Sequence, residues 1–187
     1  MFKSKILMVG PCDSGKSVIA NSLAEATDLT GGNYRPTKGV RILEFECNGL
    51  RNSSNRTLKA DVELWDCSGN SDYESCWPAM WKDTHGVIIV YNPDNLDHNG
   101  EISKWYTHFI SQQGLRDSQC MLFAHLKPDG SKQVVDLTGS LSRLKCVHTS
   151  MEDRPEVIRQ EFRTFLTHVW EAWAAKRDQE ELSIVNN

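Results

Sequence analysis

The feature that most constrains this chain is the segment 10–17, which has the sequence Gly-Pro-Cys-Asp-Ser-Gly-Lys-Ser. It follows the apolar run 6–9 and precedes a helical pattern that starts near Val18. This is the pattern G-x-x-x-x-G-K-[ST] between a strand and a helix, where backbone N–H groups and the helix N-terminus converge on phosphate oxygens. The segment therefore predicts a phosphate-binding loop between the first strand and the first helix.

The residue types in this loop suit a bound polyanion. Glycine at positions 10 and 15 permits a close approach that a Cβ would hinder. The Lys16 ammonium can neutralise the outer phosphates, and the Ser17 hydroxyl can ligate Mg²⁺. We expect the polyanion to lie against Asp13, Ser14, Gly15, Lys16, Ser17 and Val18.

Strand and helix patterns alternate along the rest of the chain. Continuous apolar runs at 86–91 and 120–124 are typical of parallel strands that are buried on both faces. The segment 102–110 has the apolar spacing of a helix packed on a surface. The segments 40–47 and 60–66 predict an antiparallel hairpin at a sheet edge. Together they predict a three-layer α/β fold with a mostly parallel six-stranded sheet and one antiparallel edge strand.

The remaining signals set the expected boundaries. The first helix is expected to end near Ala26, and a loop rich in Gly, Pro and Asn follows to Gly39. A last strand is expected at 144–148, and a final helix opens at Pro155 and ends near Ala175. We expect one domain over residues 1–177, followed by a short charged tail over residues 178–187.

Composition excludes several classes of function. The net charge of −4 provides no overall electrostatic attraction to nucleic acid or to an anionic membrane. No apolar stretch is long enough to span a bilayer, and the last residues carry no cysteine for a prenyl group. The six cysteines form no C-x-x-C pair. We therefore expect a cytoplasmic protein with reduced thiols, no nucleic-acid partner and no lipid anchor.

Candidate site residues follow the strand ends. Ligands of such sheets lie beyond the carboxyl ends of the strands. The loop 10–17, Asp66, and the segments 124–129 and 148–151 each follow a predicted strand, so they should meet at one edge of the sheet. This convergence predicts a nucleotide site, although Asp66 could instead cap a turn or a helix.

Three segments resemble Ras-like GTPases. Residues 64–69, Leu-Trp-Asp-Cys-Ser-Gly, resemble the W-D-x-x-G segment, in which the Asp contacts Mg²⁺ and the Gly N–H meets the γ-phosphate. Residues 36–39, Pro-Thr-Lys-Gly, are similar to switch I, and residues 148–151, His-Thr-Ser-Met, are similar to the segment that contacts guanine. The resemblance implies GTP or GDP as ligand, with Mg²⁺ held by Ser17, Thr37 and Asp66. It also implies nucleotide contacts from Thr37, Gly69, Ser150 and Met151. The structural alternatives are that Thr37 is a turn residue and that Ser150 caps a helix.

Two departures from the Ras-like pattern concern base selection and hydrolysis. The stretch 126–129, Leu-Lys-Pro-Asp, keeps the Lys127 and Asp129 of the N-K-x-D element, but Leu126 cannot make the polar contacts of Asn. We therefore expect looser discrimination of GTP from ATP; Lys-Pro-Asp-Gly is also a good turn sequence. Asn70, the catalytic candidate, stands where Ras-like enzymes place Gln and is one methylene shorter. With a Cys12 side chain in the loop as well, we expect weak hydrolysis.

A closer resemblance covers nearly the whole chain. Segments 1–16, 37–46, 63–67 and 74–79 resemble the Rab-like small GTPase family of the intraflagellar transport B complex. This resemblance implies coiled-coil subunits of the complex core as partners, and a location at the cilium or flagellum and its base. It favours a nucleotide-dependent binding subunit. An actively cycling GTPase, a constitutive scaffold and a nucleotide kinase are the alternatives; for the kinase we find no Arg-rich lid.

Overall fold

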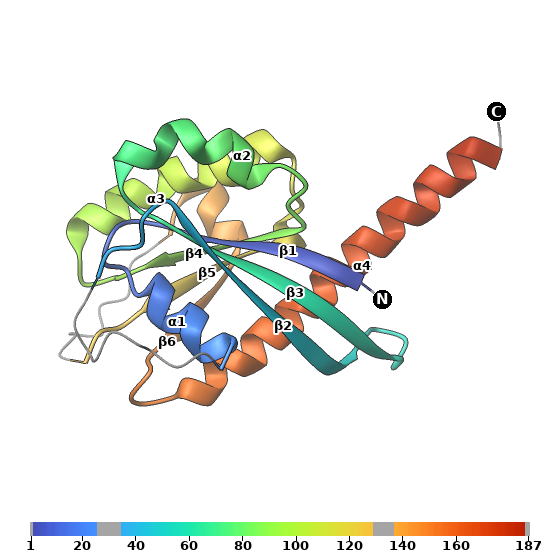
Figure 1. Cartoon of the computed structure of the whole chain (residues 1–187), viewed down its shortest axis with the longest axis horizontal. Coiled ribbons are helices and arrows are strands. Elements are labelled where there is room, and N and C mark those ends of the chain that lie inside the picture. The colour runs from blue at the N-terminus through green and yellow to red at the C-terminus, as the bar shows by residue number, and fades with distance from the viewer. Residues whose placement is uncertain (1, 26–34, 129–136, 186–187) are drawn as a thin grey trace.

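The computed structural model describes residues 2–25, 35–128 and 137–185, the last two of them by their backbone only. In these residues six strands form one sheet in the order β2-β3-β1-β4-β5-β6 (Figure 1). The antiparallel pair is β2 with β3, and every other pairing is parallel. The strands are β1 Phe2–Val9, β2 Val40–Arg51, β3 Thr57–Cys67, β4 Gly86–Tyr91, β5 Cys120–His125 and β6 Lys145–Thr149. The predicted α/β class and the antiparallel edge strand are confirmed.

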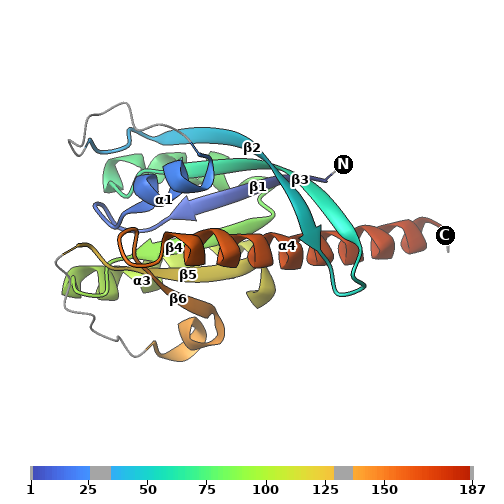
Figure 2. The same ribbon diagram turned by 90° about the horizontal axis from the view of Figure 1, so that it is seen from below.

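Helices cover both faces of the sheet because the central strands are apolar on both. Leu7 and Val9 of β1 pack in one core cluster with α2 (Trp77–Trp81) and α3 (Leu96–Phe109). Ile6 and Met8 pack in the other with α1 (Lys16–Leu23) and α4 (Pro155–Val185). Figures 1 and 2 show the resulting three layers. The alternation of β1 between the two clusters follows from the two-residue period of a strand.

Several predicted boundaries were wrong. Helix α1 ends at Leu23 rather than near Ala26, and the hairpin strands run beyond 40–47 and 60–66. Helix α4 continues to Val185, so the segment expected as a tail after residue 177 is helical as far as the structure describes it. Paired Lys176–Glu180 and Arg177–Glu181 side chains at i,i+4 spacing favour this continuation. Figure 1 shows this end of α4 projecting away from the body of the protein.

The topology brings the expected site segments to one edge. Strands β3, β1, β4 and β5 run parallel to one another, so their carboxyl ends lie at the same edge of the sheet. The loop after β1, Asp66 near the end of β3 and Leu126 just after β5 therefore share one edge. In the described part of the chain, no helix has the length and apolar character needed to cross a membrane.

Candidate nucleotide site

The loop between β1 and α1 wraps closely against its neighbours through two glycines. Gly10 and Gly15 have φ angles of +139° and +95°. A Cβ on Gly10 would lie 2.1 Å from the Val90 carbonyl oxygen, and one on Gly15 would lie 2.3 Å from the His125 ring. Both positions therefore require glycine, for conformation and for space.

Lys16 is folded into the loop that it follows. Its Nζ atom donates to the carbonyl oxygens of Gly10 and Pro11 at 2.9 and 2.5 Å, and lies 3.4 Å from Ser14 Oγ. Only 6% of the residue is exposed, and this burial lowers the pKa of Lys16 to about 8. Because that pKa is above 7, the buried ammonium is still mostly charged at neutral pH. A charged donor inside a loop of converging N–H groups is suited to phosphate oxygens.

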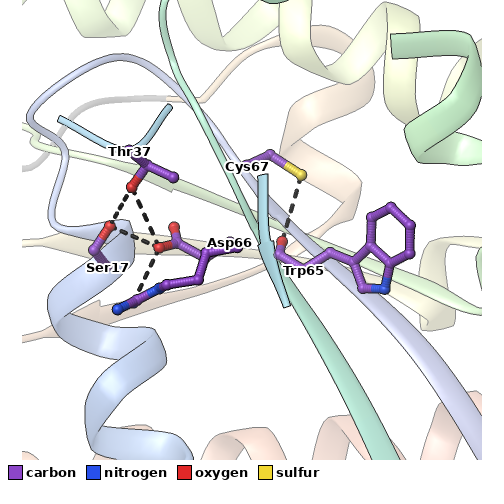
Figure 3. A network of polar contacts seen from close by, with 6 residues as sticks. Ser17, Thr37, Trp65, Asp66 and Cys67 are labelled. Carbon is purple, nitrogen blue, oxygen red and sulfur yellow. Dashed lines mark hydrogen bonds and ion pairs between the residues drawn. The ribbon is translucent and has the colours of Figure 1, made fainter. Parts of the chain in front are cut away.

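Ser17, Thr37 and Asp66 meet beside the start of α1 (Figure 3). Ser17 Oγ donates to Asp66 Oδ2 at 2.7 Å and lies 2.9 Å from Thr37 Oγ1. Thr37 Oγ1 also donates to Asp66 Oδ2, at 3.4 Å. The structure thus brings together the three residues that the sequence predicts as Mg²⁺ ligands. They come from α1, from the segment before β2, and from β3.

The donor set fits a magnesium ion that also binds phosphate. Asp66 is fully buried, and its Oδ1 atom has no hydrogen-bond partner within the described residues. Burial raises the pKa of this carboxyl, opposed mainly by the hydrogen bond from Ser17 and the charge of Arg41. Hydroxyl and carboxylate oxygens are ligands that Mg²⁺ accepts, usually together with substrate phosphates. Among the described residues, no group of three His, Cys, Asp or Glu is placed to hold a metal ion.

A cavity of about 630 Å³ opens in front of this cluster. It is large enough for a drug-sized ligand such as a nucleotide. Of the predicted nucleotide-contacting residues, those lining it are Asp13, Ser14, Gly15, Lys16, Ser17, Val18, Thr37, Gly69, Lys127, Ser150 and Met151. Asp129 lies outside the described residues.

Two predicted base contacts also bond within the protein. Lys127 forms an ion pair with Asp13 of the phosphate loop. Ser150 Oγ accepts a hydrogen bond from the Asp153 N–H at 3.2 Å, in the turn that precedes α4 rather than in the helix itself. The contact ties the Ser150 hydroxyl to its own turn while the residue still lines the cavity.

Gly69 and Asn70 lie where β3 leads into the short helix 71–76. A Cβ on Gly69 would lie 2.4 Å from Cys12 N, so this glycine lets the two loops touch. Asn70 is not among the described residues that line the cavity. Its side chain accepts from Asp72 N at 3.0 Å and donates to Asp72 Oδ2 at 3.2 Å. Its catalytic role therefore stays a prediction, and in this structure it caps the helix.

Sequence reasoning missed two residues of the site. His125, the last residue of β5, lies under Gly15, and its Nδ1 atom is 3.0 Å from Thr149 Oγ1. Burial, then the charge of Lys127, lowers the pKa of His125 to about 4. Arg41 forms an ion pair with Asp66 at 3.2 Å. The pair follows from the strand register, in which Arg41 lies opposite Asp66.

The sheet order, the phosphate loop, and the cluster of Ser17, Thr37 and Asp66 define a Ras-like GTPase fold. Comparison with known proteins agrees: residues 5–129 match the family described as Roc, the Ras of Complex, Roc, domain of DAPkinase. The chain is also similar to the intraflagellar transport protein 22 homologs of Macaca fascicularis and Homo sapiens. Identities are 50% and 49% over 187 residues, covering 99% of this chain and 100% of each relative. The chain belongs to the intraflagellar transport protein 22 family, as its sequence predicts.

Solved structures support the same assignment. The GTP-bound crystal structure of Trypanosoma brucei IFT22/74/81 contains a chain similar to this one, with a TM-score of 0.77 and 25% identity. The match covers 94% of this chain and 99% of that chain. The GDP-bound crystal structure of T. brucei IFT22 has the same fold, with a TM-score of 0.66 at 24% identity over 92% of this chain and 99% of that one.

Proposed function

We propose that this chain binds GTP and GDP with Mg²⁺ and is a nucleotide-dependent binding subunit of the intraflagellar transport B complex. The carrying observation is the Ser17–Thr37–Asp66 cluster, of which Ser17 and Thr37 line the cavity. The buried Asp66 Oδ1 and the Lys16 ammonium would then face a cation and a polyphosphate. The GTP-bound and GDP-bound T. brucei structures support the choice of nucleotide.

When bound, Mg²⁺ would neutralise phosphate charge, and Ser17, Thr37 and Asp66 are the residues that would hold it. Lys16 would turn from the carbonyl oxygens of Gly10 and Pro11 to the outer phosphates. Thr37 lies shortly before β2, which begins at Val40, so a contact between Thr37 and the ligand would order the segment beside the sheet edge. That ordering is the physical basis for a partner surface that depends on the nucleotide.

Slow or partner-dependent hydrolysis is part of this proposal. The Asn70 amide is bonded to Asp72, and orienting a water requires it to leave those bonds. Water positioning is sensitive to geometry, and a displacement of about 1 Å can lower a rate roughly a hundredfold. The Cys12 side chain is exposed at the cavity rim and further narrows the space there.

The partner that the family suggests is the coiled-coil core of the same complex. The T. brucei IFT22/74/81 structure supports other intraflagellar transport proteins as partners. A cilium or flagellum, with its base and the surrounding cytoplasm, is the location that this proposal implies.

The experiment compares the GTP affinity of the Ser17→Ala variant with that of a control, Ser103→Ala, on the exposed side of α3. With Mg²⁺ present, we expect calorimetry to show roughly 10- to 100-fold weaker GTP binding for Ser17→Ala, the scale of a hydrogen bond or ligand contact to a charged group. In EDTA, where no Mg²⁺ is available, the two variants should bind GTP with similar affinity. Equal affinities in Mg²⁺ would contradict the metal role of Ser17, and no uptake by the unsubstituted protein would overturn the function.

The same two variants distinguish a switch from a scaffold. We expect the Ser17→Ala protein to lose retention of the coiled-coil partner in a pull-down with GTP, whereas Ser103→Ala keeps it. A Ser17→Ala protein that lost nucleotide but kept its partner unchanged would assign the nucleotide a structural role only.

A further inference from the structure

The residue paired with the proposed metal carboxylate across the sheet is an arginine. In the antiparallel ladder of β2 and β3, Arg41 is the direct partner of Asp66. Directly opposed residues project from the same face, with Cβ atoms about 4.5–5.5 Å apart. The Arg41 Nη2 atom accordingly lies 3.2 Å from Asp66 Oδ2. The sheet register itself therefore places this guanidinium beside the carboxylate.

The two side chains are unequally exposed. The Asp66 side chain is 0% exposed and that of Arg41 is 42% exposed. An ionised carboxylate buried to this extent needs a compensating charge and hydrogen bonds. Among the described residues, Arg41 makes the ion pair with Asp66, whereas the Lys16 ammonium is bonded to loop carbonyls. Arg41 is thus the cation that pairs directly with Asp66, while the Lys16 charge also favours the ionised carboxylate without such a contact.

Ser17, Thr37 and Arg41 all donate to the same oxygen of Asp66, Oδ2. They would respond differently to a Mg²⁺ ion at that oxygen. The hydroxyls of Ser17 and Thr37 have lone pairs and can rotate to offer them to a metal. The Arg41 guanidinium is a donor only, and it stays charged at every physiological pH. Arg41 is therefore the partner of Asp66 that opposes a metal ion at the same carboxylate.

We propose that Arg41 is a counter-ion of Asp66 that competes with Mg²⁺, weakening Mg²⁺ binding while keeping the empty site folded. This inference rests on the proposed Mg²⁺–nucleotide function. Arg41 acts through Asp66 and is a positioning residue. Its effects should have opposite signs in the two states: it lowers metal affinity when nucleotide is bound, and it stabilises the protein when metal is absent.

The test measures the release of a fluorescent GDP analogue, mant-GDP, over a series of Mg²⁺ concentrations. Arg41→Gln removes the charge and keeps a polar side chain. Arg56→Gln is the matched control, because Arg56 is exposed in the turn between β2 and β3 and is not among the residues that line the cavity. For Arg41→Gln we expect half-maximal slowing of release at a roughly tenfold lower Mg²⁺ concentration, the scale of a partly screened charge interaction. For Arg56→Gln this Mg²⁺ concentration should stay within about twofold of that of the unsubstituted protein.

A second measurement does not depend on nucleotide turnover. In EDTA without nucleotide, the thermal midpoint of Arg41→Gln should be about 2–4 °C below that of the control, because a buried carboxylate loses its counter-ion. Saturating Mg²⁺ and mant-GDP should remove that difference. Arg41→Lys keeps the charge and covers the case in which Arg41→Gln does not fold; its Mg²⁺ midpoint should remain within about threefold of the unsubstituted value.

The outcomes separate this inference from the function that it rests on. If the unsubstituted protein takes up no mant-GDP, the proposed function fails. If it binds with a clear Mg²⁺ dependence but Arg41→Gln and Arg56→Gln coincide, only the role of Arg41 is overturned. The same holds if Arg41→Lys shifts the Mg²⁺ midpoint tenfold. If Arg41→Gln weakened the binding of a triphosphate analogue but left mant-GDP binding unchanged, Arg41 would instead be assigned to the third phosphate.

Discussion

Gly69 shows how one missing side chain holds two loops in contact. A Cβ there would lie 2.4 Å from Cys12 N and 2.5 Å from Pro11 C, and both are backbone atoms that cannot move alone. We expect Gly69→Ala to lower the free energy of unfolding by about 1–3 kcal/mol, the range for overpacking, and to weaken nucleotide binding. Urea unfolding of the two proteins gives the comparison.

Gly100 provides a matched control, because Gly→Ala there should change the free energy of unfolding in the opposite direction. It lies inside α3, and a Cβ there would meet nothing within 4 Å. Gly100→Ala should raise the free energy of unfolding by about 0.5–1 kcal/mol, because alanine loses less backbone entropy in a helix. If both variants changed stability in the same direction, the contact between Gly69 and the phosphate loop would not be the cause.

His125 predicts a pH dependence of stability. Its pKa is about 4 in the fold, against 6.5 as the ordinary value, because burial favours the neutral ring. Between these values the unfolded chain binds more protons, so the free energy of unfolding falls as the pH is lowered from about 6.5 towards 4. The contribution of His125 to that slope is at most about 1.4 kcal/mol per pH unit.

The measurement compares urea unfolding of the unsubstituted protein and His125→Gln at several pH values in that interval. Glutamine keeps a polar group towards Thr149 but does not titrate. We expect a shallower loss of stability for the variant between pH 6.5 and 4. Parallel curves would show that His125 is not the titrating group.

Helix α4 has two parts that differ in packing. Its first half contributes buried residues such as Phe162, Phe165 and Val169 to the core, whereas the side chains described after residue 175 are exposed. Figure 2 shows the helix crossing under the sheet and continuing past it. Its later turns have local ion pairs at i,i+4 spacing, which contribute little each.

Deleting residues 178–187 should therefore leave the fold stable. We expect a change below about 1 kcal/mol in the free energy of unfolding, with a smaller helical signal in circular dichroism. Phe165→Ala should lower that free energy by about 3–5 kcal/mol, because it opens a cavity between α4 and the sheet. A large loss on deletion would mean that the last turns pack against the body.

Ligand binding in the cavity should stabilise the whole molecule, because the site is built from β1, α1, β3 and the segment before β2. A ligand that binds only the folded state stabilises it by RT ln(1 + [L]/Kd), about 2.7 kcal/mol at one hundred times Kd. For a chain of this size we expect GTP with Mg²⁺ at that concentration to raise the thermal midpoint by roughly 5–10 °C.

Thermal scans with GTP, GDP and ATP, each with and without Mg²⁺, test this coupling. Leu126 leads us to expect a smaller gap between GTP and ATP than an N-K-x-D site gives. A midpoint that did not respond to any of the three nucleotides would contradict the nucleotide site.

Much of the architecture follows from local sequence. The phosphate loop was predictable because glycine spacing, Lys16 and Ser17 lie within eight consecutive residues whose backbone conformation is decided locally. The alternation of strands and helices was predictable because apolar periodicity reports which faces are buried. Asp66 could be placed near the loop from topology, since parallel strands end at a common edge, whereas Thr37 was placed by the resemblance to switch I.

Other features depend on contacts between distant residues, which no local pattern encodes. The Arg41–Asp66 pair depends on strand register, and the place of His125 under Gly15 depends on how β5 packs beside the loop. The bonds of Asn70 to Asp72 and the continuation of α4 past residue 177 are local, and the sequence patterns did not predict them. The amino-acid sequence by itself thus determined the class of fold and the phosphate-binding residues. Only the tertiary structure decided which charges face Asp66, because long-range pairing is set by the packing of the whole sheet.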